Sequence, residues 1–174
     1  MAKGGDRRWR TLDAGAEEAF EQFYRKNERR VGRLLLGMMA DPALVADAAQ
    51  ETWLRYLHYV DRPEPHLDDA LLLAVARNVV RTALRRRRAE TPTALFWHAD
   101  PEPFEDSLLM ADLVRQLPYY EREVVVLHYA LDMPLDAICR LLRAPSGTVK
   151  SRLHRARQRL REAYLAGEGA RHGA

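Results

Sequence analysis

The 174-residue sequence has a single cysteine and no long apolar run. One cysteine excludes an intramolecular disulfide and a zinc site built from several cysteines, and Cys139 lies in an apolar helical pattern that predicts a small core residue. The apolar string at 31–40 is far shorter than the about 20 residues of a membrane helix, so we expect no membrane insertion. The N-terminus has positive charge but no apolar segment after it, which argues against a signal peptide and favours a cytoplasmic location.

Strand signals and catalytic motifs are also nearly missing. The one β-branched run, REVVVLHYA at 122–130, has helical flanks. The six histidines are scattered, and neither a Gly-rich phosphate loop nor a cluster of carboxylates and histidines with catalytic or metal-binding spacing is seen. We therefore expect no enzyme activity, no catalytic residue, no metal site and no cofactor.

Helical periodicity is what the sequence does contain. Apolar residues recur at three- and four-residue steps, and the patterns predict helices over 14–40, 42–60, 69–88, 105–116, 118–131, 135–142 and 146–165. Asp41 and Asp68 or Asp69 stand where a helix cap is needed. Three prolines and several acids between 89 and 106 predict a linker. The predicted fold is all-α, with two small helical domains (14–89 and 105–166), an acidic linker at 90–104 and a disordered tail at 167–174.

The second domain has the pattern of a helix-turn-helix at 134–160, a short helix, a break of about four residues and a longer helix. One face of the longer helix is apolar, and its residues are Val149, Leu153, Ala156 and Leu160. The opposite face carries side chains that suit a major groove, namely Lys150, Ser151, His154, Arg155 and Gln158. A hairpin whose outer face is merely basic and solvated is the alternative. It is disfavoured because the run from 147 contains no acid before Glu162.

These segments resemble the extracytoplasmic-function (ECF) RNA polymerase sigma factors of the sigma-70 family. TVKSRLHRARQRL at 148–160 is similar to the hallmark of their region 4, and two segments of the first half, DAAQETWLRYL at 47–57 and LLLAVARNVVRTALRRRR at 71–88, resemble region 2. The resemblance implies a sigma factor that directs core RNA polymerase to specific promoters. Region 2 would bind the clamp helices of the largest polymerase subunit and melt and hold the -10 element, and region 4 would read the -35 element of the promoter DNA. An anti-sigma factor is a further partner that the resemblance suggests.

The resemblance and the helical faces together give three groups of candidate residues. The polymerase-binding group is a polar face of the 42–60 helix and consists of Asp47, Gln50, Glu51 and Arg55. The -35 group is Ser146, Thr148, Lys150, Ser151, Arg152, His154 and Arg155. The -10 group combines a loop for a flipped base with arginines for phosphates, and consists of His66, Asp68, Asp69, Arg77, Asn78, Arg81 and Arg85.

Two other classes of protein remain alternatives at this point. A stand-alone helix-turn-helix transcriptional regulator would bind duplex promoter DNA without polymerase and would usually dimerise. A nuclease or other nucleic-acid enzyme would need a carboxylate or histidine cluster. One local feature departs from the family, because Arg143 stands in the turn where a glycine is common. A left-handed backbone at Arg143 costs about 1 kcal/mol, so we expect Arg143→Gly to stabilise the domain.

Overall fold

The structure is a computed structural model, and it describes residues 14–60, 67–89 and 105–172. These residues form helices and no strand, which confirms the predicted all-α class. No helix among them is long and apolar enough to cross a membrane. His66 and the predicted linker at 90–104 lie outside the described residues.

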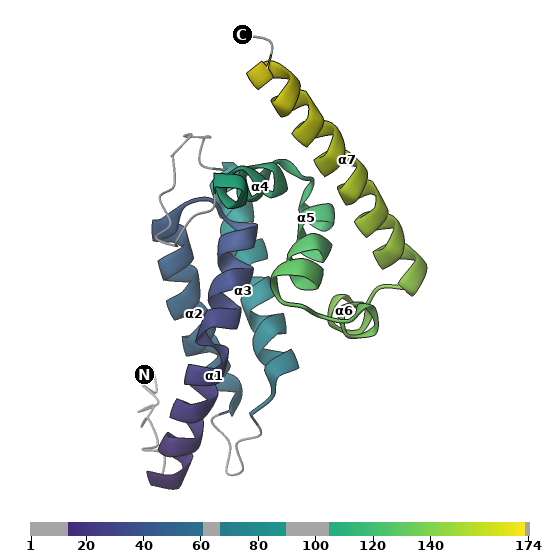
Figure 1. Cartoon of the computed structure of the whole chain (residues 1–174). Coiled ribbons are helices and arrows are strands. Elements are labelled where there is room, and N and C mark those ends of the chain that lie inside the picture. Colours follow the sequence, from purple (N-terminus) through teal and green to yellow (C-terminus); the bar gives the residue numbers. More distant parts are fainter. Residues whose placement is uncertain (1–13, 61–66, 90–104, 173–174) are drawn as a thin grey trace.

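The first half of the chain forms a bundle of three helices, α1 (Ala14–Met38), α2 (Pro42–Val60) and α3 (Asp69–Ala89), as Figure 1 shows. The predicted helix starts are confirmed by side-chain caps. The Asp41 carboxylate accepts a hydrogen bond of 3.0 Å from the N–H of Ala43, and the Asp68 carboxylate accepts one of 2.8 Å from Ala70. Each cap satisfies one of the N–H groups that the first turn of a helix leaves without a partner.

The second half forms α4 (Glu105–Gln116), α5 (Tyr119–Val125), the π-helical turn η1 (Val126–Ala130), α6 (Leu135–Leu142) and α7 (Ser146–His172). The helix predicted over 118–131 is therefore an α-helix that widens into a π-helical turn. The helix α7 continues to His172, beyond the end predicted near 165, so most of the tail predicted as disordered is helical. No proline interrupts this stretch, and glycine at about 1 kcal/mol weakens a helix without ending it.

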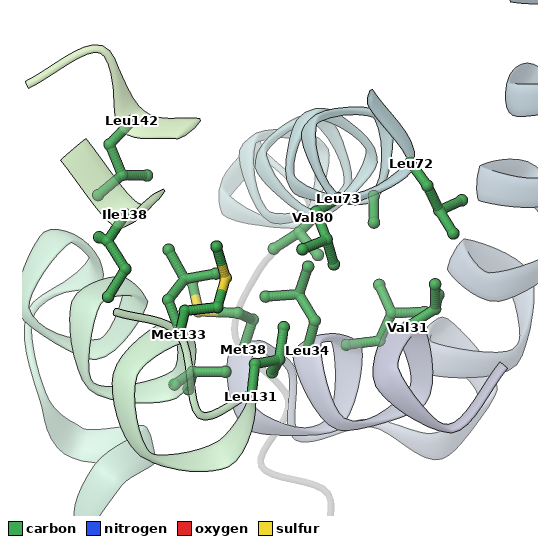
Figure 2. Packing of buried hydrophobic residues seen from close by; sticks show 14 of the residues in the cluster. Val31, Leu34, Met38, Leu72, Leu73, Val80, Leu131, Met133, Ile138 and Leu142 are labelled. Carbon is green, nitrogen blue, oxygen red and sulfur yellow. The ribbon is translucent and has the colours of Figure 1, made fainter. Parts of the chain in front are cut away.

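The two halves share one hydrophobic core, although the sequence predicted two domains. Figure 2 shows Met133 and Leu131, which follow η1 and belong to the second half, beside Met38 and Leu34 of α1. All four are buried, and α3 adds Val80 to the same cluster. Cys139 of α6 is half-buried and packs against this core, in line with its predicted role as a small core residue.

Gly37 of α1 lies at a close approach between the two halves. A Cβ atom at this position would stand 2.7 Å from Cγ2 of Val126 in η1. Real Cβ atoms do not come this close to another carbon, so only glycine fits without a shift of its neighbour. Glycine in a helix interior costs about 0.5–1 kcal/mol relative to alanine, and here the missing side chain lets η1 pack directly on α1.

Candidate nucleic-acid and polymerase interface

The second helix of the helix-turn-helix, α7, is oriented as predicted. Val149, Leu153 and Ala156 of α7 are buried at 0%, 4% and 0% exposure. They face the buried Ile138 and Leu142 of α6 and the rest of the core. The opposite face is open to solvent, and its exposed side chains are Lys150, Ser151, His154, Arg155 and Gln158.

Arg143 closes α6 in the left-handed conformation, with φ 50° and ψ 44°. Its N–H donates to the carbonyl of Arg140 at 3.2 Å, and the N–H of Ala144 donates to Cys139 at 3.0 Å. This pair of bonds is the Schellman motif that usually places glycine at the position of Arg143. Ser146 is the first helical residue of α7, and the N–H of Thr148 bonds to the carbonyl of Pro145 at 2.9 Å.

Several arginines of α7 are held by side chains of the preceding helices. Glu121 of α5 is 7% exposed, and its Oε1 accepts a hydrogen bond of 3.3 Å from Nε of Arg155 while Oε2 lies 3.1 Å from Nε of Arg159. The guanidinium of Arg152 lies 4.8 Å from the ring centre of Tyr120. The outer face of α7 therefore has two parts. Lys150 and His154 are exposed near its N-terminal end, whereas Arg152, Arg155 and Arg159 contact side chains of α5.

In the predicted -10 group, Arg77 of α3 is joined to the second half of the chain. Its Nε donates a hydrogen bond of 2.6 Å to Oε1 of Glu123, a side chain of α5 that is only 1% exposed. The hydroxyl of Tyr119 donates to the same oxygen at 3.1 Å. Burial and the adjacent Glu123 carboxylate raise the pKa of Tyr119 above its ordinary value of 10. Asn78 and Arg81, by contrast, are exposed on α3, as is Arg85.

The two acidic residues at the start of α3 make contacts within the bundle. Besides its cap, Asp68 has its backbone N–H bonded at 2.7 Å to the hydroxyl of Tyr56, which is fully buried. The Asp69 carboxylate accepts hydrogen bonds of 3.1 Å from Lys26 and Asn27 of α1. Burial alone would raise the pKa of Asp69, but these bonds and nearby positive charges hold it below its ordinary value. Both residues therefore connect helices of the bundle. A role for them in a pocket that holds a flipped base stays a prediction.

The predicted polymerase-binding residues lie along the outer side of α2. Asp47 and Gln50 are exposed, and Nε of Arg55 donates to Glu51 at 2.6 Å one turn away. Gln50 also lines a groove of about 650 Å³ between α1 and α2 that the sequence analysis missed. The apolar part of its lining is Tyr24, Val31, Ala49, Trp53, Leu54 and Leu57.

The signal for this groove was present in the sequence as apolar residues outside the buried stripe of α2. The buried positions on α2 are Ala48, Thr52, Tyr56 and Val60, whereas Leu54 is 51% exposed. An exposed leucine alone is ordinary, but an exposed leucine beside a polar ridge and a half-buried tryptophan makes this groove a candidate binding surface. Among the described residues, no three of histidine, cysteine, aspartate or glutamate gather in a way that could hold a metal ion.

An all-helical chain that presents one face of a helix-turn-helix to solvent, with basic side chains on that face, is typical of the DNA-binding proteins of transcription. Two family models match the chain. The model of sigma-70 region 2 matches residues 23–90, and that of sigma-70 region 4 matches residues 107–160.

Similar proteins agree with these matches over most of this chain. The RNA polymerase sigma factor CarQ of Myxococcus xanthus is 32% identical over 88% of this chain and 92% of its own length. The ECF RNA polymerase sigma factor SigE of Mycolicibacterium smegmatis is 32% identical over 90% of this chain and 65% of its own length. The sigma factor RpoE of Bartonella quintana, solved in complex with the anti-sigma factor NepR, has a TM-score of 0.71 at 20% identity, with 83% of this chain and 96% of that chain covered, and so shares the fold.

The chain therefore belongs to the sigma-70 family of RNA polymerase sigma factors, within the ECF group. The first half (α1 to α3) is region 2 and the second half (α4 to α7) is region 4. Membership of this family disfavours the alternative of a stand-alone helix-turn-helix regulator. Sigma factors are generally non-catalytic proteins.

Proposed function

We propose that this sigma factor brings core RNA polymerase to its promoters by docking region 2 on the clamp helices of the largest subunit and region 4 on the -35 element. Region 2 also melts and holds the -10 element. The observation that carries the proposal is the phase of α7, which buries Val149, Leu153 and Ala156 and turns the basic side chains outward. The chain itself catalyses no reaction, and it acts in the cytoplasm, where polymerase and promoters meet.

The docking surface on polymerase combines the polar ridge of α2 with the groove beside it. Asp47, Gln50 and Glu51 offer hydrogen-bond acceptors and negative charge to a polar partner helix. The adjacent Trp53 and Leu54 offer apolar area, because Leu54 is half exposed and both line the groove. An apolar centre with a polar rim is the usual composition of a specific protein interface.

The -35 reading surface is the N-terminal half of α7. Lys150 and His154 are exposed and lie one turn apart, and Ser151 flanks them, so these side chains reach base edges when the helix enters a major groove. Ser146 and Thr148 stand in the first turn, where the positive end of the helix dipole favours a phosphate. Arg152 and Arg155 complete the predicted -35 group at its edge.

The -10 surface is the face of α3 that carries Arg77, Asn78, Arg81 and Arg85. Arginines on one face neutralise phosphates and give affinity that falls with salt. The segment before α3, with His66 and Asp68, and Asp69 at the first position of α3 are proposed to hold the flipped base. An anti-sigma factor is proposed as a regulatory partner, since the Bartonella quintana relative was solved with one.

Run-off transcription with bacterial core polymerase, with and without this chain, tests the function. We expect promoter-specific transcripts only when the chain is present, and their absence on a genomic template library would refute the function. A stand-alone regulator would instead bind duplex promoter DNA tightly without polymerase, which a gel-shift assay detects.

Paired variants separate the two docking surfaces. Lys150→Ala with Arg155→Ala is expected to lower -35-dependent initiation by at least about 30-fold, since the pair removes two base contacts of about 1–3 kcal/mol each, while binding to core polymerase persists. Leu54→Asp is expected to abolish co-purification with core polymerase. Arg140→Ala is the matched control, because Arg140 is an exposed arginine of region 4 that pairs with Asp136 on α6.

A further inference from the structure

Two arginines of α7 share one buried carboxylate of α5, the helix that lies beside α7 in Figure 1. Oε1 of Glu121 accepts a hydrogen bond of 3.3 Å from Nε of Arg155, and Oε2 lies 3.1 Å from Nε of Arg159. The two arginines are one helical turn apart, so a single carboxylate reaches both of them. Glu121 is buried, whereas the side chains of Arg155 and Arg159 are 52% and 58% exposed.

The burial of Glu121 makes it a fixed point for these arginines. Exposed ion pairs, such as Asp136 with Arg140 on α6, contribute little because water and salt screen them. A buried carboxylate without a partner has a large desolvation cost, so Glu121 stays paired. Each arginine is therefore held at Nε, and a guanidinium group held at one nitrogen loses much of its freedom to turn.

The held arginines keep hydrogen-bond donors for DNA. A guanidinium group has five N–H donors in a planar fork, and one carboxylate oxygen cannot accept from all of them. Arg155 follows Ser151 by one turn, and both side chains are exposed on the face of α7 where the proposed base contacts lie. Arg155 can therefore meet a base edge while Glu121 still holds its Nε.

The residue before Glu121 contacts its arginine in a different way. The guanidinium of Arg152 lies 4.8 Å from the ring centre of the exposed Tyr120. A ring face attracts a cation but accepts no directed hydrogen bond from a particular nitrogen. Glu121, in contrast, fixes the direction of the fork that it holds, because a hydrogen bond to a carboxylate has a preferred geometry.

We propose that Glu121 is a positioning residue for -35 recognition, which aims Arg155 at one base pair and holds Arg159 for a nearby phosphate. The proposal rests on the proposed function of α7 as the -35 reading helix. A freely moving arginine neutralises phosphates on any sequence. An arginine whose fork is already fixed contacts a guanine edge only in the correct register of helix and groove, and it loses less freedom on binding. Glu121 thus converts part of the positive charge of α7 into sequence specificity.

Binding-site selection tests the proposal. Holoenzyme made from bacterial core polymerase and the full chain binds duplex promoters from the run-off experiment whose -35 segment is randomised, and the bound DNA is sequenced. The base pair read by Arg155 is the position at which Arg155→Ala loses the wild-type preference. We expect Glu121→Gln to reduce the preference at this same position at least about 3-fold, out of the about 5- to 150-fold that a good arginine–guanine contact provides. The position that Lys150→Ala affects should keep its preference within about 2-fold.

A control variant separates positioning from net charge. Asp136→Asn removes the same charge from region 4 at an exposed site that pairs with Arg140, and it should leave every base preference unchanged. Equal losses in Asp136→Asn and Glu121→Gln would overturn the proposal, and so would a wild-type preference in Glu121→Gln or the absence of any position that depends on Arg155. A wild-type holoenzyme that selects no -35 sequence would instead refute the proposed function itself.

A double-mutant cycle separates positioning from a general defect of the fold. The measured quantity is the ratio of holoenzyme affinities for the selected -35 segment and for a scrambled one. Positioning acts through Arg155, so Glu121→Gln should lower this ratio at least about 3-fold in the wild-type background and less than about 2-fold in an Arg155→Ala background. Equal losses in both backgrounds would overturn the proposal.

A second variant keeps the test decisive if Glu121→Gln does not fold. Glu121→Asp retains the charge but is one methylene shorter, so it cannot hold both arginines in the same place. We expect it to reduce the preference at the position read by Arg155 as well. A full wild-type preference in Glu121→Asp would leave charge alone as the cause and would overturn the positioning role.

Discussion

Replacing Arg143 by glycine should stabilise this protein. The residue closes α6 at φ 50° and ψ 44°, the left-handed region, and its side chain is exposed. A Cβ atom in this region costs about 1–2 kcal/mol. Glycine removes that cost, but it lowers stability by about 0.5 kcal/mol because its unfolded chain has more freedom.

The net gain from Arg143→Gly is therefore about 0.5–1.5 kcal/mol. For a chain of this length, a change of 1 kcal/mol shifts the melting temperature by about 2–4 °C, so we expect a rise of about 1–6 °C in a thermal unfolding experiment followed by circular dichroism. The Schellman bonds from Arg143 and Ala144 use backbone atoms only and should survive the change.

Two comparison variants isolate the physical cause. Arg143→Ala keeps the Cβ atom and should give none of the gain, which separates backbone strain from loss of the arginine side chain. Asp132→Gly acts at the other described non-glycine residue with positive φ, at 52°, and should gain less because aspartate tolerates this conformation better. A melting temperature of Arg143→Gly that is unchanged or lower, or a gain of equal size with alanine, would refute the reasoning.

Three further expectations concern region 2. Tyr56→Phe should lower the free energy of unfolding by about 1–2 kcal/mol in a urea titration, because its buried hydroxyl bonds to the chain just before α3, while Tyr59→Phe at an exposed site of the same helix should change it by less than about 0.5 kcal/mol. Asp69 has a pKa below its ordinary value of 3.8 in the folded chain, so its stabilising effect is present above that pH and is lost as pH falls through the folded pKa. Asp69→Asn should accordingly make the free energy of unfolding depend less on pH in this range. A plot of unfolding free energy against pH that runs parallel to wild type would contradict this expectation. Gly32→Ala should raise stability by up to about 1 kcal/mol, whereas Gly37→Ala should not, because its Cβ would lie 2.7 Å from a side chain of η1; equal gains would remove the argument for close packing there.

Local patterns predicted most of the helices because each helix here has its own start signal and its own apolar stripe. Asp41 and Asp68 cap α2 and α3 as expected. On α2, Thr52 is buried and donates to the carbonyl of Ala48 at 2.6 Å, while Trp53 lies beside the stripe. Periodicity alone does not decide which of these two neighbours is buried, because both positions border the apolar face of the helix.

The sequence predicted which candidate side chains are exposed where exposure follows from the phase of one helix, and it did not predict the contacts that candidate residues make with neighbouring helices. The exposed face of α7 follows from its own sequence, so Lys150 and His154 could be placed beforehand. The pairing of Arg77 with Glu123 joins residues 46 positions apart, and no local pattern carries that information. The groove beside Gln50 likewise forms only when α1 and α2 pack together.

The sequence by itself determined the helices, the helix-turn-helix and the family, because caps, stripes and motif spacing act over a few residues. Only the tertiary structure decided that regions 2 and 4 share a core and that α5 holds an arginine from each of them. The physical reason is that Gly37, Met38 and Glu123 are unremarkable in their own helices. Their roles arise where η1 packs on α1 and where a buried carboxylate meets Arg77, contacts that only the folded chain brings together.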